Sequence, residues 1–309
     1  MARMSKTYTK KKNNIELVNE RSEYITKAKN TLGGWGFFRY LYSKFTFRIV
    51  GLNLIMIMLF LPMFYVILRL NGQISNAAQY LPFSNTFGLG LAPWDGVQNY
   101  LASVTRNYTM QKYLWLLLCV PVAGMAFTGG FAVIRDSYWT GKLKIVKPFF
   151  IGIYKCGLQN LPLYVLVGGG LLGIYAFSIG TLAWARWIAV IVQVLLWIVL
   201  ALLTMYALVF TGVNCLHKQS FFTTLVSSFK ICYTHIISHI ITFIFVALPL
   251  TLMFIIGTSV VASLLIVANV LMGMLYVAIV WMIHMIRTCG NYSVVIEPAP
   301  VLEAEEQNG

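Results

Sequence analysis

Six long apolar runs constrain the fold of this chain more than any other feature of its sequence. They cover residues 49–70, 113–134, 161–179, 184–212, 236–257 and 260–286, and none of them contains Asp or Glu. A helix needs about 20 apolar residues to cross the hydrocarbon core of a bilayer. Because no water is available there to bond backbone groups, each run must satisfy its own backbone as a helix. The sequence therefore predicts an all-α, polytopic transmembrane helical bundle with six spans.

Composition excludes the main alternatives to a membrane protein. The chain is 59% hydrophobic and 10% charged, whereas soluble domains have about 45–50% apolar and about 25% charged residues. The net charge of +14 does not indicate nucleic-acid binding. Eleven of the 23 Lys and Arg lie in residues 1–48, most of the rest flank the apolar runs, and no recognised nucleic-acid-binding motif is present. The composition therefore predicts the lipid bilayer as a partner, and not nucleic acid.

The distribution of Lys and Arg predicts the orientation in the membrane. Cytoplasmic segments of membrane proteins carry an excess of these residues. Residues 1–48, 135–160, 213–235 and 287–309 together hold 19 of the 23 Lys and Arg residues, and the segments on the other side hold four. We therefore expect a multi-pass protein of the cell membrane with both termini in the cytoplasm.

Three regions follow from these patterns. Residues 1–36 form a basic cytoplasmic head, and residues 37–290 form the transmembrane helical domain. Residues 291–309 form an acidic tail, which we expect to be disordered because it has no apolar face to bury. Residues 71–111 form one long external loop. Its role is open between a small ordered cap and a loop that binds a partner.

A double-Phe motif followed by a Lys occurs three times, each time before a pair of apolar runs. The copies are Phe37-Phe38 with Lys44, Phe149-Phe150 with Lys155, and Phe221-Phe222 with Lys230. One interpretation is a repeat of three helical hairpins, each led by a cytoplasmic interfacial helix. The other is that Phe and Lys gather at any cytoplasmic interface.

The only side chains with metal-binding spacing are Cys232, His235 and His239. The two histidines are four residues apart and share one helix face, which can suit zinc. The segment lacks the Glu of a zinc protease motif, however, and no carboxylate lies near it in sequence. We therefore expect these side chains to bond neighbouring helices or lipid headgroups. No nucleophile motif is present, so the sequence predicts neither an enzyme nor a cofactor.

Glycine, proline and one arginine are predicted to have structural roles. Gly169 and Gly173 form a Gly-x-x-x-Gly pair in the third run, which allows another helix to approach closely. Pro62 and Pro121 lie within the first two runs, where proline kinks a helix. Such breaks serve a substrate pathway or ordinary packing, and we favour packing. Arg135 is expected to pair with Asp136 at the interface.

Several short segments resemble the YesL-like family of uncharacterised bacterial integral membrane proteins. They are Lys44-Phe45, Arg48-Ile49, Leu52-Asn53-Leu54, Leu61-Pro62, Val133-Ile134-Arg135, and Phe149-Phe150 through Lys155. The chain departs from that family by its long charged head and its external loop. The resemblance implies a membrane protein associated with carbohydrate uptake systems, and it implies no catalytic residues.

Three functional hypotheses follow, of which the third, a membrane-embedded enzyme, needs a clustered metal or nucleophile site. The first is a non-enzymatic membrane protein that acts by interaction with other membrane proteins, as an accessory component of a carbohydrate uptake system. The alternative is a transporter or channel in its own right, with a polar cavity lined by groups such as Gln159, Asn160, Gln193 or Asn269. The absence of carboxylates from the apolar runs disfavours ion-coupled transport, although backbone carbonyls at broken helices can also bind ions.

Overall fold

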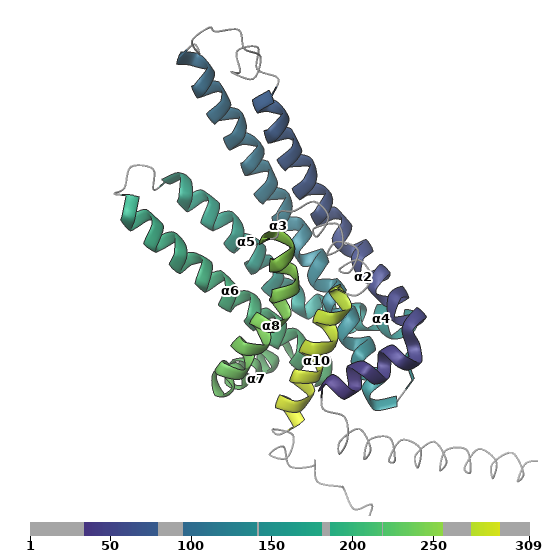
Figure 1. The fold of residues 1–309 in the computed structure, drawn as a ribbon. Helices are drawn as coiled ribbons and strands as arrows, with labels where there is room; N and C mark the ends of the chain where they lie inside the picture. Colours follow the sequence, from purple (N-terminus) through teal and green to yellow (C-terminus); the bar gives the residue numbers. More distant parts are fainter. Residues whose placement is uncertain are drawn as a thin grey trace, which may run out of the picture.

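The structure is a computed structural model of the whole chain, and it describes residues 34–79, 95–140, 142–180, 186–217, 219–255 and 273–290. These residues are almost entirely helical and contain no strand (Figure 1). In chain order the helices are α2 (Gly34–Gln79), α3 (Asp95–Thr140), α4 (Val146–Gly152), the π-helix η2 (Ile153–Gly157), α5 (Leu158–Gly180), α6 (Arg186–Leu216), α7 (Phe221–Thr234), α8 (Ile236–Ile255) and α10 (Met274–Gly290).

Four helical segments are long and apolar enough to cross a membrane. They are Arg39–Gln73, Ala102–Thr140, Val146–Ser178 and Trp187–Leu216. A fifth candidate is the pair α7 and α8, whose axes are bent by 91° at a short break. The prediction of an all-helical membrane protein is therefore confirmed in its coarser form. Residues 260–272 of the sixth predicted run lie outside the described residues, and the rest of that run lies in α10.

The helices extend beyond the apolar runs. Helix α2 continues to Gln79 and α3 begins at Asp95, so much of the predicted external loop is helical. Lys112 of α3 donates a hydrogen bond to Asn71 Oδ1 of α2 (3.2 Å). Hydropathy predicts which residues can lie in lipid, but it does not predict where a helix ends. Helices α2 and α3 therefore extend beyond the predicted apolar runs. Residues 80–94 of the loop, residues 1–33 of the head and residues 291–309 of the tail lie outside the described residues.

Each double-Phe motif is followed by an interruption of regular α-helix. In α2 the break is at Phe45, whose φ of −134° and ψ of 28° are not helical. After α4 the chain passes through the π-helix η2 before α5 begins. After α7 the break is at His235, with φ −118° and ψ 27°. The segments that carry the motifs are therefore short helices joined to longer ones by local defects.

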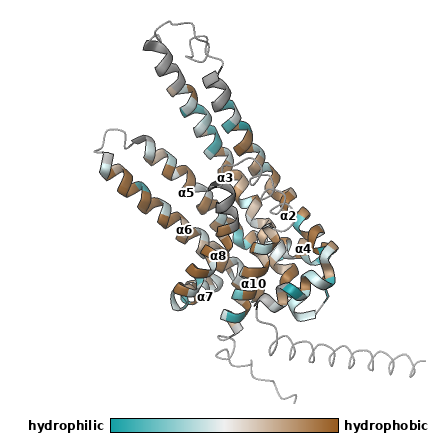
Figure 2. Cartoon of the chain, viewed as in Figure 1, coloured by the Kyte–Doolittle hydropathy of each residue, from teal (hydrophilic) through white to brown (hydrophobic). Residues whose placement is uncertain are grey.

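Hydrophobic residues run along most of α6 and α8 (Figure 2), and many of their large apolar side chains are exposed. Only 11% of the most apolar stretch of α6 is buried within the protein. Helix α7 turns its large apolar side chains outward, at Phe222, Val226, Phe229 and Tyr233. The residues that it buries are Thr224, Ser228, Ile231 and Cys232, two of which are polar. A helix of a soluble protein turns its polar side to the outside, so the outward apolar face of α7 fits a helix that lies against lipid.

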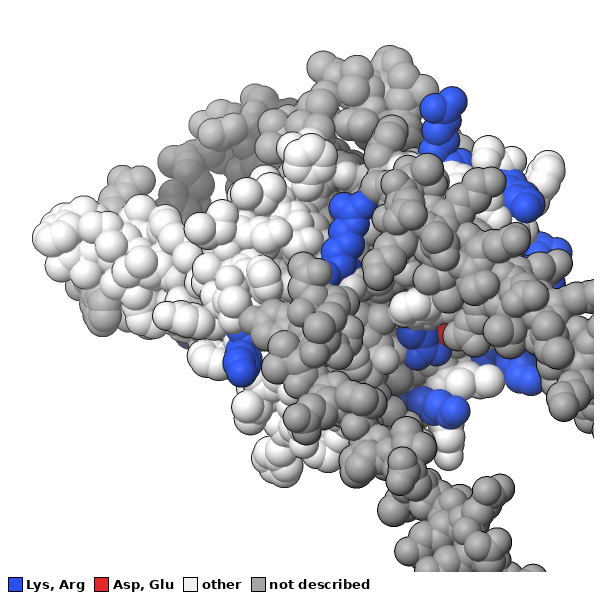
Figure 3. Space-filling model, turned by 90° about the horizontal axis from the view of Figure 1, so that it is seen from below, with Lys and Arg blue, Asp and Glu red and all other residues white. Residues whose placement is uncertain are grey.

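One end of the molecule carries most of the described basic side chains. Figure 3 shows this end, with Lys and Arg side chains spread over it and one small acidic patch. These residues lie at the start of α2, around the α3–α4 connection, on η2 and α7, and at the end of α10. The exposed ones are Arg39, Lys44, Arg48, Lys142, Lys144, Lys147, Lys155, Lys230 and Arg287. Among the described side chains, Asp136 is the only acid.

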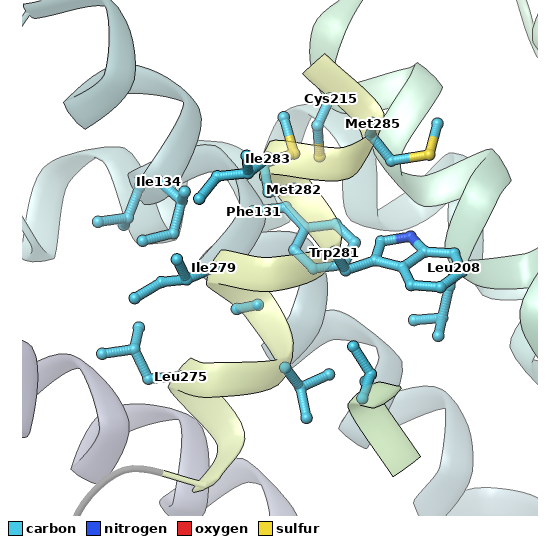
Figure 4. Close-up of a cluster of buried hydrophobic side chains, with 14 of the residues drawn as sticks. Phe131, Ile134, Leu208, Cys215, Leu275, Ile279, Trp281, Met282, Ile283 and Met285 are labelled. Atoms are coloured by element: carbon cyan, nitrogen blue, oxygen red, sulfur yellow. The ribbon is translucent and has the colours of Figure 1, made fainter. Parts of the chain in front are cut away.

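Helix α10 forms the centre of the core. It packs against α2, α3, α6 and α8, and its Leu275, Ile279, Trp281 and Met282 are completely or almost completely buried (Figure 4). The buried Asn53 of α2 accepts a hydrogen bond from the backbone N–H of Leu275 (2.9 Å). The first N–H groups of a helix have no partner within the helix. Asn53 therefore satisfies one such group where no water reaches it.

Substitution of two glycines of α5 by alanine should change the thermal stability of the protein in different ways. A Cβ at Gly168 would lie 3.1 Å from the Cα and 3.2 Å from the carbonyl oxygen of Leu117, whereas a Cβ at Gly173 would meet nothing within 4 Å. Overpacking costs about 1–3 kcal/mol, and alanine in a helix gains about 1 kcal/mol over glycine. We expect Gly168→Ala to lower the thermal unfolding temperature in detergent and Gly173→Ala to leave it unchanged or raise it. Equal effects would contradict the described α3–α5 packing.

Candidate functional site

Three buried polar side chains join α3, α5 and α6 near the basic end of the molecule, where α5 begins and α6 ends. Asn160 Nδ2 of α5 donates to Thr128 Oγ1 of α3 (2.9 Å), and Asn214 Nδ2 of α6 donates to Asn160 Oδ1 (2.8 Å). Thr128 Oγ1 in turn donates to the carbonyl of Gly124 in its own helix (3.0 Å). We call Thr128, Asn160 and Asn214 the polar seam. Since a buried polar group without a partner is costly, these bonds hold the three helices in one register.

The seam continues into the π-helix. Asn214 Nδ2 also donates to the carbonyl of Cys156 in η2 (3.2 Å), and the Cys156 thiol lies 3.7 Å from the carbonyl oxygen of Asn214. A π-helix shifts the backbone bonding pattern and is often found at functional sites. Here the side chain of Asn214 bonds directly to the backbone of that irregular turn. The defect in the helix and the polar seam are therefore one local structure.

Arg135 lies at the end of the seam, where α6 finishes. Its Nη1 donates to the carbonyl of Cys215 (2.6 Å), and its Nε and Nη2 donate to Asp136 Oδ1 (3.0 and 2.6 Å). The predicted Arg135–Asp136 pair is thus present. The last carbonyls of a helix lack partners within it and carry partial negative charge. Arg135 satisfies one of them and ties the end of α3 to the end of α6.

A second polar contact joins α5 and α6 beside the seam. The hydroxyls of Tyr164 and Thr211 lie 3.0 Å apart, and both residues are buried. A Cβ at Gly124 would collide with the Tyr164 ring. Glycine at this position of α3 therefore provides the space in which the aromatic ring lies.

The groups predicted to line a cavity do not gather at one place in the described structure. Asn160 belongs to the polar seam. Gln159 donates to the carbonyl of Gln219 (3.4 Å), and Gln193 donates to Ser178 Oγ at the other end of α5 (3.3 Å). Asn269 lies outside the described residues. The sequence therefore pointed to Asn160, but it did not identify its partners Thr128 and Asn214.

The histidine segment does not form a metal site among the described residues. No group of three or more His, Cys, Asp or Glu side chains is arranged there to hold a metal ion. His239 instead shares a hydrogen bond of 2.9 Å with Nε2 of His284, which lies on α10. His235 is the residue between α7 and α8, and Cys232 is buried in α7. His284 is 45 residues from His239 in the chain, so only the fold reveals this pair.

Two buried nitrogen atoms at this pair have no hydrogen-bond partner among the described residues. They are Nε2 of His239 itself and Nε1 of the neighbouring Trp281. The two rings have centroids 6.1 Å apart. Helices α8 and α10 thus each contribute one unsatisfied polar atom to this part of the core.

The predicted Gly-x-x-x-Gly pair lies on the outside of the described bundle. Gly173 is exposed and Gly169 is half-buried. A Cβ at Gly169 would reach only Leu117 Cδ1, at 4.0 Å. The close approach of α3 to α5 takes place at Gly168 instead. Pro62, Pro121 and Pro162 lie inside α2, α3 and α5 without ending these helices.

Comparison with protein-family models, with curated proteins and with solved structures found no match to this chain. The resemblance to YesL-like proteins therefore stays a prediction from the sequence.

The polar seam should show measurable coupling between Thr128 and Asn160. Removing a hydrogen bond between membrane helices costs on average about 0.6 kcal/mol and at most about 1.7 kcal/mol. We expect a double-mutant cycle of Thr128→Val and Asn160→Leu to give a coupling free energy in this range, measured by unfolding in detergent.

Thr204 provides the control for this cycle, because its hydroxyl bonds only the carbonyl of Leu200 in its own helix in the described structure. Thr204→Val and Asn160→Leu should be additive within about 0.5 kcal/mol. Additivity of the Thr128–Asn160 pair would contradict the seam.

Proposed function

We propose that this chain is a non-enzymatic integral membrane protein that acts by binding another membrane protein through α5, as an accessory component of a carbohydrate uptake system. The observation that carries the proposal is the outward-facing Gly169–Gly173 face. The association with carbohydrate uptake comes from the resemblance to YesL-like proteins.

The face on α5 has the features of a helix-docking surface. Val165, Gly169, Gly173 and Ala176 follow one side of the helix at intervals of three and four residues, and all are exposed or half-buried. The space beside Gly173 contains no described atom within 4 Å of a Cβ position. In lipid, apolar surface alone does not drive helices together, and small residues promote association because they let backbones approach closely. The small side chains of this face let the backbone of a partner helix approach closely.

The interior of the protein supports an interaction role rather than a chemical one. The amide groups of the polar seam bond each other and the backbone, and Asp136, the only described acid, is held by Arg135. Groups engaged in this way are positioned to hold helices together. The free apolar surface is the part of the described structure that remains available to another protein.

We further propose six spans in three hairpins, with both termini on the cytoplasmic side of the cell membrane. The excess of basic residues in the segments assigned to that side supports the orientation. The helix breaks after each double-Phe motif support the hairpin scheme, because each motif then lies on its own short helix at the basic end.

Bulky substitution on the α5 face should remove the partner without unfolding the chain. We expect Gly173→Ile to abolish co-purification of a membrane protein from native membranes, while helicity and thermal stability stay close to wild type. The matched control is Gly72→Ile in α2, where a Cβ also meets nothing within 4 Å. This variant should retain the partner.

Two results would contradict this proposal. One is recovery of the wild-type chain as a lone protein from mildly solubilised native membranes. The other is equal partner recovery from wild type, Gly173→Ile and Gly72→Ile. Unchanged carbohydrate uptake after deletion of the gene would refute the carbohydrate assignment alone.

A second candidate function is transport by this chain itself. The polar seam favours it, because it places buried amide groups beside a π-helix and near Pro162 inside an otherwise apolar bundle. Transport predicts substrate flux in proteoliposomes that contain only this chain, whereas the accessory role predicts none.

A further inference from the structure

The densest group of described cations surrounds the connection between α3 and α4. Lys142 and Lys144 lie in this connection, Lys147 lies in the first turn of α4, and Arg48 lies on α2. All four side chains are exposed. We call Arg48, Lys142, Lys144 and Lys147 the basic cluster.

A single hydrogen bond brings the two parts of this cluster together. Arg48 Nη1 donates to the carbonyl of Leu143 (3.0 Å), across 95 residues of sequence. Leu143 itself is buried, so the connection is anchored against the core at this point. Its neighbours Lys142 and Lys144 therefore lie on either side of the residue that Arg48 contacts. The contact leaves the other donors of the guanidinium group available to a ligand.

Exposed apolar side chains lie directly beside these cations. Phe47, next to Arg48, is 93% exposed. Val146, Phe150 and Tyr154 are exposed at intervals of four residues along α4 and η2. A helix that presents both basic and large apolar side chains outward is typical of a segment at the membrane interface. The surface thus combines the basic cluster, which can bind an anion, with apolar side chains that favour contact with lipid.

No described acidic side chain offsets this positive charge. Asp136 is the only acid among the described side chains, and it forms an ion pair with Arg135 (2.6 Å). The basic cluster is therefore available to an external anion. Guanidinium and ammonium groups bind phosphate oxygens well, because their hydrogen bonds are strengthened by charge.

We infer that the basic cluster binds the phosphate headgroup of an anionic phospholipid, whose acyl chains lie against Phe47 and the exposed apolar side chains of α4. A free phosphate ion would use the same cations, but it would gain nothing from the exposed phenyl ring. The adjacent apolar surface is the reason to assign the site to a lipid. The inference does not depend on which protein, if any, binds α5.

Lipid titration of the full-length protein in detergent, monitored by native mass spectrometry, tests this site. The probes are phosphatidylglycerol, phosphatidylcholine with the same acyl chains, and inorganic phosphate. Each basic residue near an anionic lipid surface contributes about 1 kcal/mol, or about fivefold in affinity. We expect phosphatidylglycerol to bind at least tenfold more tightly than phosphatidylcholine. The triple variant R48Q/K144Q/K147Q should weaken phosphatidylglycerol binding about 10–100-fold and leave phosphatidylcholine binding unchanged.

The control R69Q/R106Q/K112Q removes the same charge from the other end of the α2–α3 pair. Arg69 is 21 residues from Arg48 along α2, which is roughly 30 Å at 1.5 Å per residue. This variant should retain wild-type affinity for phosphatidylglycerol. The double variant K144Q/K147Q keeps the bond between Arg48 and Leu143, and it should still lose at least fivefold in affinity. It therefore tests the site even if the triple variant folds poorly.

Three results would overturn the inference. The first is equal binding of the two lipids by the wild-type protein. The second is an equal loss of phosphatidylglycerol binding in the control triple variant, which would show general charge attraction. The third is inorganic phosphate binding as tightly as phosphatidylglycerol and failing in the same variants, which would indicate a site for a soluble anion.

Discussion

The structure depends on the backbone satisfying its own hydrogen bonds where no water is present. Helices solve this problem along their length but not at their ends or at their defects. The apolar outer surface of α6 and α8 shows where the protein meets an apolar surrounding. In that surrounding, side-chain packing and a few buried polar bonds must join the helices, because lipid competes for apolar contacts as well as any side chain does.

Polar side chains meet this need at three particular positions. Asn53 bonds the first turn of α10, Asn214 bonds the backbone of the π-helix, and Arg135 bonds the last turn of α6. Each of them supplies a partner to a backbone group of another helix at an end or a defect. The same bonds fix which helices are neighbours. The polar interior is thus explained by backbone chemistry, and the outward face of α5 and the basic cluster remain as the surfaces available to partners.

Hydropathy predicted the helical membrane protein, because length and apolarity are local properties that a sequence displays directly. It could not predict that α10 is the buried centre while α6 is exposed, because both runs are apolar on all sides. The pairs His239–His284 and Asn160–Asn214 join residues far apart in sequence, so no spacing rule finds them. Gly168, rather than its neighbours, makes the close contact with α3. Its role depends on which side of α5 faces α3. Three consecutive glycines cannot predict this orientation, because they point to three different sides of the helix.

The central claim is that hydrocarbon surrounds the exposed apolar face of the bundle, and Trp197 in the middle of α6 tests it most directly. Its side chain is 45% exposed. In bilayers, the difference in tryptophan fluorescence between the wild-type protein and the Trp197→Phe variant is the emission of Trp197. We predict that lipids brominated in their acyl chains quench this component and that aqueous acrylamide does not. Quenching by acrylamide without quenching by the brominated lipids would contradict the account.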